Sequence, residues 1–372
     1  MHIVQVITEL KPAGAERILA NLSICLKEKG HDITVISLKP LPENRIIVDE
    51  LFSNNIPILS LNLTKLKPWR IFKLNKLINI LINKSEIRNL KPEIIIHSHL
   101  MHANLICRLN KMLGGNFKLL NTIHIAEKRK SRFWYFIFDR LTLNYCDHIN
   151  AVSEAARNHH SLKLNIDHRK ISIVYNGINS PKTLNKEEIT NLKKEWGFSN
   201  CSKVIGSVGR LNWQKGYDIF FKLLSGLSNN IPENDNWGVV ILGEGNQRKL
   251  LEKLSVKASK NIKIALPGYR KNAPECISAF DLFVMPSRYE GQPLTLLEAM
   301  PTGISIVSSD IDTIKEVLHN YSNSISVDFQ DKDSVIKSIM KIINNPNIKF
   351  DNHFTVEKMT KEYLEIYKKL QI

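Results

Sequence analysis

The sequence predicts an α/β chain made of two doubly wound domains. Its 372 residues exceed one average domain, and with 43% hydrophobic and 24% charged residues the composition is that of a globular protein. Short apolar runs alternate with amphipathic segments, and several of the runs end in a glycine-containing loop. This alternation is typical of parallel sheets covered by helices. We expect one domain at 1–180, a second at 181–354 and a final helix at 355–372.

The composition also limits the cellular compartment. The five cysteines are scattered, with no C-x-x-C pair, which favours reduced thiols in a cytosol over a disulfide framework or a zinc site. No apolar run approaches the roughly 18 residues that span a bilayer. The first ten residues, MHIVQVITEL, lack a basic flank and a cleavage site, so they predict a strand and not a signal peptide. A cytoplasmic protein, soluble or peripheral on a membrane, is expected.

Positive charge is concentrated in the first half. Residues 1–180 contain 26 Lys and Arg against 14 Asp and Glu, a net charge of +12, whereas the remainder contains 26 against 22, a net charge of +4. This excess of positive charge predicts that the first half binds a polyanion, which could be nucleic acid, an acidic membrane surface or a phosphorylated substrate. A general basic bias that serves solubility is the alternative.

The first domain begins with a strand, a helix and a second strand. HIVQVIT at 2–8 and ITVISL at 33–38 predict buried parallel strands, and the segment between them has its apolar residues on one helical face. Gly14 comes before that helix, where a residue without a side chain lets the chain turn and point N–H groups outward. The order is that of a Rossmann-type unit, although a full G-x-G-x-x-G is missing.

Two later strands end in histidines. They are expected at 92–99 and 118–125, and the carboxyl edge of an α/β sheet is where sites are built. Lone histidines are more often structural, and this is the favoured interpretation for His97, His99 and His102.

A basic and aromatic segment follows at 127–141. It contains Lys128, Arg129, Lys130, Arg132, Phe133, Trp134, Tyr135, Phe136 and Phe138. Such a segment suits a bilayer interface, and a core helix with a solvated basic lead-in is the alternative. Ser153 is a natural N-cap for the next helix. A strand at 170–179, which ends in an Asn-Gly turn pair, completes the domain.

The second domain opens on a strand followed by two cations. After the strand at 204–208 come Gly209-Arg210 and Lys215-Gly216. A guanidinium fork and an ammonium point charge on a glycine loop suit a pyrophosphate. Two exposed cations without a ligand are the alternative. Further strands are expected at WGVVIL, at NIKIALPG and at 304–308.

Two carboxylates follow the apolar run at 280–287. Glu290 is expected in the loop after this strand, and Glu298 about one turn inside a helix with Pro293 in its first turn. The start of a helix suits a phosphate, and a loop carboxylate can accept hydrogen bonds from a polyhydroxylated group. A diphosphate joined to a sugar and a ribose would fit. The alternative is that Glu298 pairs with a surface lysine and Glu290 is solvated.

Three stretches resemble one family. Arg-x-Glu-Gly-x-Pro-x-x-x-Leu-Glu-Ala-Met, from Arg288, resembles the signature of retaining, nucleotide-sugar-dependent glycosyltransferases of family four. Gly-Arg-Leu-x-x-x-Lys-Gly and Ala-Gly-Ala-Glu-Arg at 13–17 resemble two more of its motifs. The resemblance implies the GT-B fold, with two Rossmann-like domains facing across a cleft and a last helix that crosses back to the first domain. Gln292 and Pro301 depart from the family pattern, which often has an aromatic residue and Ala there.

The resemblance also implies residue roles. Arg210 and Lys215 would stabilise charge on the leaving diphosphate. Glu290 and His124, the latter in a Thr-x-His motif, would contact the transferred sugar, and Glu298 would hold the ribose. The remaining implied binding residues are Gly14, Gly291, Pro293, Leu294, Thr295 and, where the base is seated, Tyr269. No metal and no cofactor are expected, because protein cations replace the metal, and Asp310-x-Asp312 receives no role.

The expected activity is the retaining transfer of a hexosyl or N-acetylhexosaminyl group from a nucleoside diphosphate sugar. The donor is expected to be a UDP-sugar rather than a GDP-sugar. The acceptor would be a hydroxyl of a saccharide or lipid-linked saccharide in polysaccharide or lipopolysaccharide synthesis. We expect the protein on the inner face of the cell membrane, docked to its anionic surface, with no nucleic-acid partner. A nucleotide-sugar epimerase of related fold and a basic nucleic-acid-binding protein are the alternatives; the latter predicts cations interleaved with aromatics along one groove.

Overall fold

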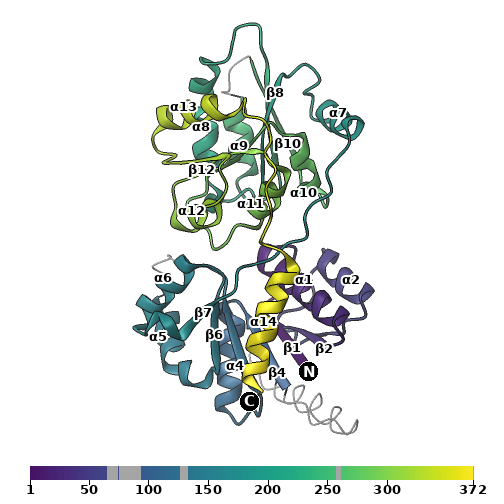
Figure 1. Cartoon of the computed structure of the whole chain (residues 1–372), viewed down its shortest axis with the longest axis vertical. Coiled ribbons are helices and arrows are strands. Elements are labelled where there is room, and N and C mark those ends of the chain that lie inside the picture. Colours follow the sequence, from purple (N-terminus) through teal and green to yellow (C-terminus); the bar gives the residue numbers. More distant parts are fainter. Residues whose placement is uncertain (65–73, 75–93, 126–132, 257–260, 372) are drawn as a thin grey trace. The chain divides into compact units, whose positions relative to one another are not determined.

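The computed structural model describes residues 1–64, 74, 94–125, 133–256 and 261–371. The chain forms two compact units (Figure 1). Unit 1 comprises Met1–Ile178 and Phe354–Ile372, and unit 2 comprises Asn179–His353. Each unit is built around its own parallel sheet.

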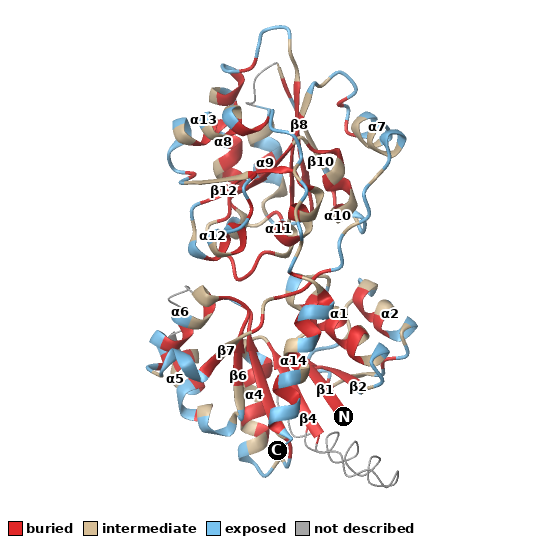
Figure 2. Ribbon diagram, viewed as in Figure 1, coloured by how far each residue is buried: buried red, intermediate tan, exposed pale blue. Residues whose placement is uncertain are grey.

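Unit 1 has a seven-stranded sheet in the order β3-β2-β1-β4-β5-β6-β7, with all pairs parallel. The strands are β1 His2–Ile7, β2 Asp32–Ser37, β3 Ile58–Ser60, β4 Ile94–His99, β5 Lys118–Ile123, β6 His148–Ala151 and β7 Ile171–Ile173. Every residue of β1 and β4 is buried, and the strands are accordingly red in Figure 2. The strand order reverses between β1 and β4, which is the position where doubly wound sheets place their ligands.

The helices of unit 1 include one from the far end of the chain. They are α1 Gly14–Glu28, α2 Ile46–Ser53, α4 Met101–Met112, α5 Phe133–Thr142, α6 Glu154–Leu164 and α14 Val356–Leu370, with the short 3-10 turns η3 Leu143–Tyr145 and η4 His168–Lys170. Helix α14, yellow in Figure 1, packs against α1. Ser153 caps α6 as predicted, since its side chain accepts from the N–H of Ala156 at 3.1 Å. Gly14 is the first residue of α1, whereas it was expected just before the helix, and its φ is not positive.

The predicted strand at 170–179 is too long. β7 ends at Ile173, and the chain then leaves the sheet so that Ile178 bonds to Phe354 and bridges to Thr355. A Cβ at Gly177 would lie 2.1 Å from the carbonyl oxygen of Thr355. Glycine is therefore needed here because the two backbone segments touch.

Unit 2 has a six-stranded sheet in the order β10-β9-β8-β11-β12-β13, again all parallel. The strands are β8 Lys203–Val208, β9 Trp237–Leu242, β10 Ile262–Gly268, β11 Leu282–Met285, β12 Ser305–Ser309 and β13 Ser324–Val327. From β8 the chain builds outward to β9 and β10, and from β11 it builds the other way to β12 and β13. The reversal lies between β8 and β11, so the loops that follow these two strands flank a topological switch point.

Helices cover this second sheet. They are α7 Lys186–Glu195, α8 Tyr217–Ser228, α9 Arg248–Ser255, α10 Ala273–Cys276, α11 Leu294–Ala299, α12 Asp312–Leu318 and α13 Lys332–Ile342, with 3-10 turns η5 Trp213–Lys215, η6 Ile277–Ala279 and η7 Met300–Thr302. Helix α8 buries a run of large apolar residues in the core of the unit. Each such side chain contributes about 1.5–3 kcal/mol when it leaves water. None of the described helices is long and apolar enough to cross a membrane.

Candidate active site

Glycines bring the loops after β8 and β11 into contact. Gly216 has φ = 67°, and a Cβ on it would lie 1.9 Å from the carbonyl oxygen of Pro286. The N–H of Arg288 also donates to the carbonyl of Gln214 at 2.8 Å. Only a residue without a side chain can adopt this positive φ and also let the carbonyl of Pro286 come so close. The loop that carries Lys215 is thereby held against the loop that carries Glu290.

Lys215 and Glu290 form an ion pair in which Nζ lies 2.7 Å from Oε1. Their side chains are 14% and 6% exposed. The hydroxyl of Ser287 also donates to Oε1 at 2.7 Å, and Nε2 of Gln214 donates to Oε2 at 3.5 Å. The structure thus joins two residues whose roles were predicted separately. It also adds Ser287 and Gln214, which are not among the residues predicted from the sequence and which only their position beside the motif residues could have suggested.

Arg288, in the loop after β11, makes further bonds to the segment that follows β8. Its guanidinium makes a two-pronged bond to the carboxylate of Asp218, at 2.7 and 2.8 Å, and donates to the carbonyl of Trp213 at 2.6 Å. The bond to Arg288 lowers the pKa of Asp218. The guanidinium also lies 4.6 Å from the centre of the Trp213 ring, which is 58% exposed. Planar bidentate contacts of this kind fix geometry as well as charge.

The other predicted residues of unit 2 follow the carboxyl ends of strands or lie at α11. Arg210 is exposed at the end of β8, and Tyr269 is exposed just after β10. The helix after Glu290 is shorter than expected: Pro293 occupies the N-cap of α11, and the helix itself runs only from Leu294 to Ala299. Glu298 is half-buried within it, and Gly291 is buried in the loop before it.

One buried hydroxyl at the start of α11 has no protein partner. Oγ1 of Thr295 makes no hydrogen bond to any residue that the structure describes. A buried hydroxyl without a partner costs roughly 1–3 kcal/mol. It is therefore suited to a polar ligand at this sheet edge.

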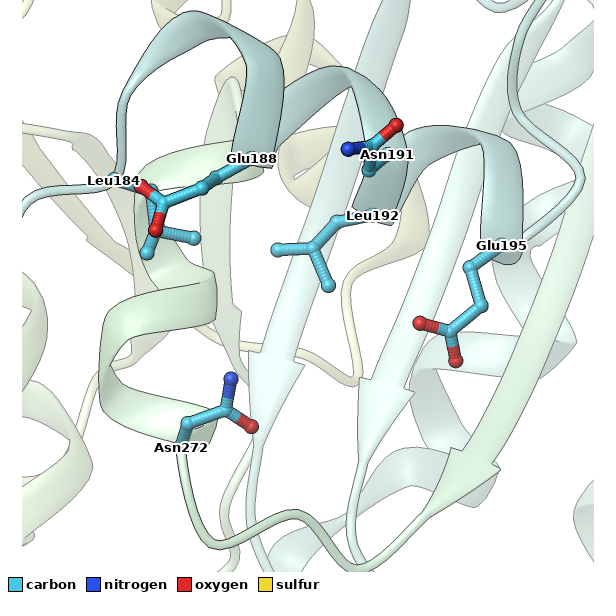
Figure 3. A pocket seen from close by; sticks show the side chains of 6 residues that line it. All are labelled: Leu184, Glu188, Asn191, Leu192, Glu195 and Asn272. Carbon is cyan, nitrogen blue, oxygen red and sulfur yellow. The ribbon is translucent and has the colours of Figure 1, made fainter.

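A shallow hollow of about 280 Å³ lies elsewhere on unit 2, beside α7 (Figure 3). It is lined by Leu184, Glu188, Asn191, Leu192, Glu195 and Asn272. It contains none of the predicted site residues, and its two charged side chains, Glu188 and Glu195, are both acidic. Because the described residues that line this hollow include no cation to bind a diphosphate, the loops after β8 and β11 are the better candidate.

In unit 1 three histidines lie together in the sheet. Nδ1 of His99 is 3.0 Å from Nε2 of His124, and the rings of His97 and His99 are 4.0 Å apart. All three are buried. Burial lowers the pKa of His124 to about 4, and burial together with the neighbouring imidazoles lowers the pKa of His97 and of His99 well below the ordinary value. All three imidazoles are therefore neutral at pH 7. His102, in contrast, is exposed on α4.

Two tyrosines from α14 complete this histidine cluster. The hydroxyl of Tyr367 lies 2.7 Å from Nδ1 of His97. The hydroxyl of Tyr363 accepts from Nδ2 of Asn150 at 3.0 Å and lies 3.3 Å from Oγ1 of Thr122. A spacing of four residues places both rings on one face of α14. An amphipathic pattern predicts the helix, but the polar partners of its buried face are more than 200 residues away in the sequence.

In the described part of the basic and aromatic segment, some apolar side chains are buried and others are exposed. Lys128, Arg129, Lys130 and Arg132 lie outside the described residues. Phe136 is buried and packs against His160, so it is unavailable to a bilayer, whereas Phe138 and Leu141 of α5 are 54% and 70% exposed. Asp139 anchors the helix because its carboxylate pairs with both Arg108 and His160. Burial alone would raise the pKa of Asp139, but these partners bring it below its ordinary value.

Neither aspartate of Asp310-x-Asp312 joins the site. Both pair with Lys315, at 2.8 and 3.8 Å. Among the residues with described positions, no group of three or more His, Cys, Asp or Glu side chains could hold a metal ion.

The sequence matches two family models that together cover most of the chain. Residues 12–181 match Glycosyltransferase Family 4, and residues 188–358 match Glycosyl transferases group 1. A relative from Escherichia coli, UDP-Gal:alpha-D-GlcNAc-diphosphoundecaprenol alpha-1,3-galactosyltransferase, is 26% identical over 95% of this chain and 93% of its own.

Solved structures share the fold. HepE of Anabaena, solved in complex with UDP, has a TM-score of 0.78 at 16% identity over 99% of this chain and 100% of its own. The lipopolysaccharide outer core galactosyltransferase WaaB has a TM-score of 0.70 at 18% identity, again over 99% and 100% of the two chains. With two Rossmann-like sheets and matches along nearly its whole length, this chain belongs to glycosyltransferase family 4, the group 1 glycosyl transferases of GT-B fold, and is a nucleotide-sugar glycosyltransferase.

Proposed function

We propose that this transferase moves a hexosyl or N-acetylhexosaminyl group from a UDP-sugar to a lipid-linked saccharide, with retention at the anomeric carbon. The observation that carries the proposal is the Lys215–Glu290 pair, a cation for the diphosphate beside a carboxylate for sugar hydroxyls at the switch point of the second sheet. The E. coli relative, named for a UDP-sugar donor and an undecaprenol-linked acceptor, supports both halves of the substrate assignment.

The reaction breaks the bond between the anomeric carbon and the diphosphate oxygen. The acceptor oxygen bonds to the same face of that carbon, and its proton passes to the leaving phosphate oxygen. Lys215 and Arg210 stabilise the charge that develops on the diphosphate as this bond breaks. No metal is needed in this scheme, because the two cations supply the positive charge.

The remaining proposed contacts are those that the family resemblance implies. Glu290 accepts hydrogen bonds from hydroxyls of the transferred sugar, and Glu298, within α11, accepts them from the ribose. Gly291, Pro293 and Leu294 present the loop and the start of α11 to the donor, and the buried hydroxyl of Thr295 gains a partner there. Tyr269, after β10, borders the site of the base.

Two residues of unit 1 are included in the proposal on the family resemblance. Gly14, the first residue of α1, is assigned to the diphosphate, to which its N–H would donate. His124, at the carboxyl end of β5, contacts the transferred sugar. A neutral imidazole suits this role, because it can accept a hydrogen bond from a hydroxyl at one nitrogen and donate at the other.

The acceptor explains the charge of the first half of the chain. A lipid-linked saccharide lies at an anionic membrane surface, and the net +12 of residues 1–180 favours docking there from the cytoplasmic side. Phe138 and Leu141, exposed on α5, can enter the headgroup layer once the charges have brought the unit to the surface.

We expect calorimetry with UDP, GDP and UDP-sugars to test the donor assignment. Wild-type protein should bind UDP more tightly than GDP. Glu298→Gln should weaken binding of bare UDP, because the ribose loses an anionic acceptor. Glu290→Gln should leave bare UDP unaffected and weaken only the UDP-sugar. The amide oxygen of this variant can still accept from Lys215, so it is a conservative control for loop position. If both variants bind bare UDP as the wild type does, Glu298 does not hold the ribose.

Sedimentation with lipid vesicles tests the membrane assignment. The protein should pellet with anionic vesicles, dissociate from them as the salt concentration rises, and not bind neutral vesicles. The reason is that each basic residue near an anionic surface contributes about 1 kcal/mol of binding free energy. Changing Lys128, Arg129, Lys130 and Arg132 together to Ser should abolish pelleting. A matched control changes Lys332, Lys337, Lys341 and Lys349, all exposed in unit 2, to Ser and should pellet normally. Equal loss in both variants would mean that net charge, and not this segment, drives the attraction.

A further inference from the structure

A line of buried hydrogen bonds runs from α14 to His124 inside unit 1. Nε2 of Gln5 donates to the hydroxyl of Tyr367 at 3.4 Å, and Oε1 of the same amide lies 2.7 Å from Nε2 of His99. Nδ1 of His99 then lies 3.0 Å from Nε2 of His124. Gln5 and His99 are fully buried, and His124 nearly so. The line therefore links the C-terminal helix to a residue at the carboxyl edge of the sheet.

With the Gln5 amide oriented as it is in the structure, the order of donors and acceptors along this line is fixed. An amide oxygen only accepts, so the hydrogen of the His99 ring is on Nε2. His99 is neutral because burial holds its pKa far below 7, so its Nδ1 carries no hydrogen and accepts. The hydrogen between the two imidazoles must then come from Nε2 of His124. Nδ1 of His124 takes part in none of these bonds and keeps its lone pair.

We propose that Gln5 and His99 are positioning residues that hold His124 as the Nε2–H tautomer, so that its Nδ1 accepts a hydrogen bond from a sugar hydroxyl. The proposal rests on the role of His124 proposed above. It adds the reason why the ring presents an acceptor and not a donor, and it gives a function to this buried polar cluster.

Tyr367 determines which way the Gln5 amide points. Its hydroxyl is shared between Nε2 of Gln5 and Nδ1 of His97, 2.7 Å away, and Nε2 of His97 lies 2.7 Å from Oγ1 of Thr122. With the hydroxyl hydrogen on the His97 side, the phenol oxygen accepts from the amide, and the amide oxygen is left facing His99. If the amide were reversed, every hydrogen along the line would reverse, and His124 would present a donor. The docking of α14 thus selects the tautomer of His124.

Nitrogen-15 NMR of histidine-labelled protein tests this order directly, without any substrate. At pH 7.5 the signals of His124 and of His99 should both show a protonated Nε2 and an unprotonated Nδ1. Their assignment comes from the signals that disappear in His124→Gln and His99→Gln. A His124 protonated on Nδ1, or an equal mixture of tautomers, would overturn the proposal whatever the turnover of the enzyme.

Two variants test the coupling to α14. Gln5→Leu and Tyr367→Phe should each produce mixed tautomers at His124. They should also lower kcat roughly 10- to 100-fold, the range for partners that orient a site histidine, while the Kd for bare UDP stays unchanged. The control is Tyr363→Phe, which removes an equally buried hydroxyl from the same helix. That hydroxyl bonds to Asn150 and lies 3.3 Å from Oγ1 of Thr122, so it reaches Tyr367 only through Thr122 and His97 and makes no bond to Gln5. It should keep the tautomer and the kcat of the wild type.

The two possible failures are distinguishable. Normal turnover of His124→Ala would remove the proposed sugar contact, whatever tautomer the wild-type ring has. A wild-type tautomer in both Gln5→Leu and Tyr367→Phe would overturn the positioning role, even if His124 contacts the sugar. A mixture of tautomers in the Tyr363→Phe control would equally overturn it, because the tautomer of His124 would then not depend specifically on the bond between Tyr367 and Gln5.

Discussion

Replacing Lys215 by Ala is expected to lower turnover by roughly 10²-fold or more, the scale for losing one preorganised group that stabilises transition-state charge. Arg210→Ala should have a comparable effect, because both cations face the same leaving diphosphate in the proposed reaction. Turnover measured at saturating UDP-sugar and acceptor checks this. Near-normal rates in both variants would rule out this pair of cations as the stabilising group.

The two variants should differ in stability. Arg210 is exposed, so its removal should leave the melting temperature nearly unchanged. Lys215→Ala removes the cationic partner of a carboxylate that is only 6% exposed, which should cost about 1–3 kcal/mol. The double variant Lys215→Ala with Glu290→Gln should recover part of that loss, since the uncompensated charge is gone. If the double variant is no more stable than Lys215→Ala, the ion pair does not explain the loss.

Unit 1 should lose stability steeply as the pH falls below about 6.5. In the unfolded chain His97, His99 and His124 bind protons near pH 6.5. Burial lowers their pKa values in the folded unit, to about 4 for His124 and well below the ordinary value for the other two. The unfolded state therefore binds more protons as the pH falls, and the stability present above pH 6.5 is lost. Each histidine contributes about 1.4 kcal/mol per pH unit, so the three together approach about 4 kcal/mol per pH unit near pH 5.5.

Hydrogen exchange of the β4 amides, corrected for the intrinsic rate at each pH, measures this dependence within unit 1. The strands β8 and β11 are the internal control, because His319 and His353 of unit 2 are both exposed. His99→Gln should lower the slope for β4 by about one third, since one of three protonation sites is removed. A slope for β4 that equals the slope for β8 between pH 6.5 and 5 would contradict the histidine explanation.

The sequence alone determined the class of fold and the family. Apolar runs of strand length that alternate with helical periodicity required parallel sheets. Each predicted strand lies close to an observed one, apart from the short β7, whereas the edge strands β3 and β13 were not predicted. The capping role of Ser153 is local chemistry and was predictable for that reason. The motif residues Lys215 and Glu290 could be selected from the sequence because their neighbours on either side resemble those of a known family.

Only the tertiary structure decided which of these side chains meet. Lys215 and Glu290 are 75 positions apart, and their contact depends on β8 and β11 being neighbours and on Gly216 letting one loop reach the carbonyl of Pro286. It also decided that Phe136 turns inward while Phe138 turns outward, because Asp139 is fixed by Arg108 and His160.

The buried polar residues of unit 1 show most clearly which contacts the sequence alone does not predict. Gln5 and Tyr367 are 362 positions apart, and nothing near either residue in the sequence indicates that they bond. A pattern of apolar residues gives the face that a helix buries, but not the partners that it meets there. Those partners are set by the packing of α14 in unit 1, and a buried polar group needs a hydrogen-bond partner to be stable. The state of His124 is therefore a property of the folded unit and not of any one segment of the chain.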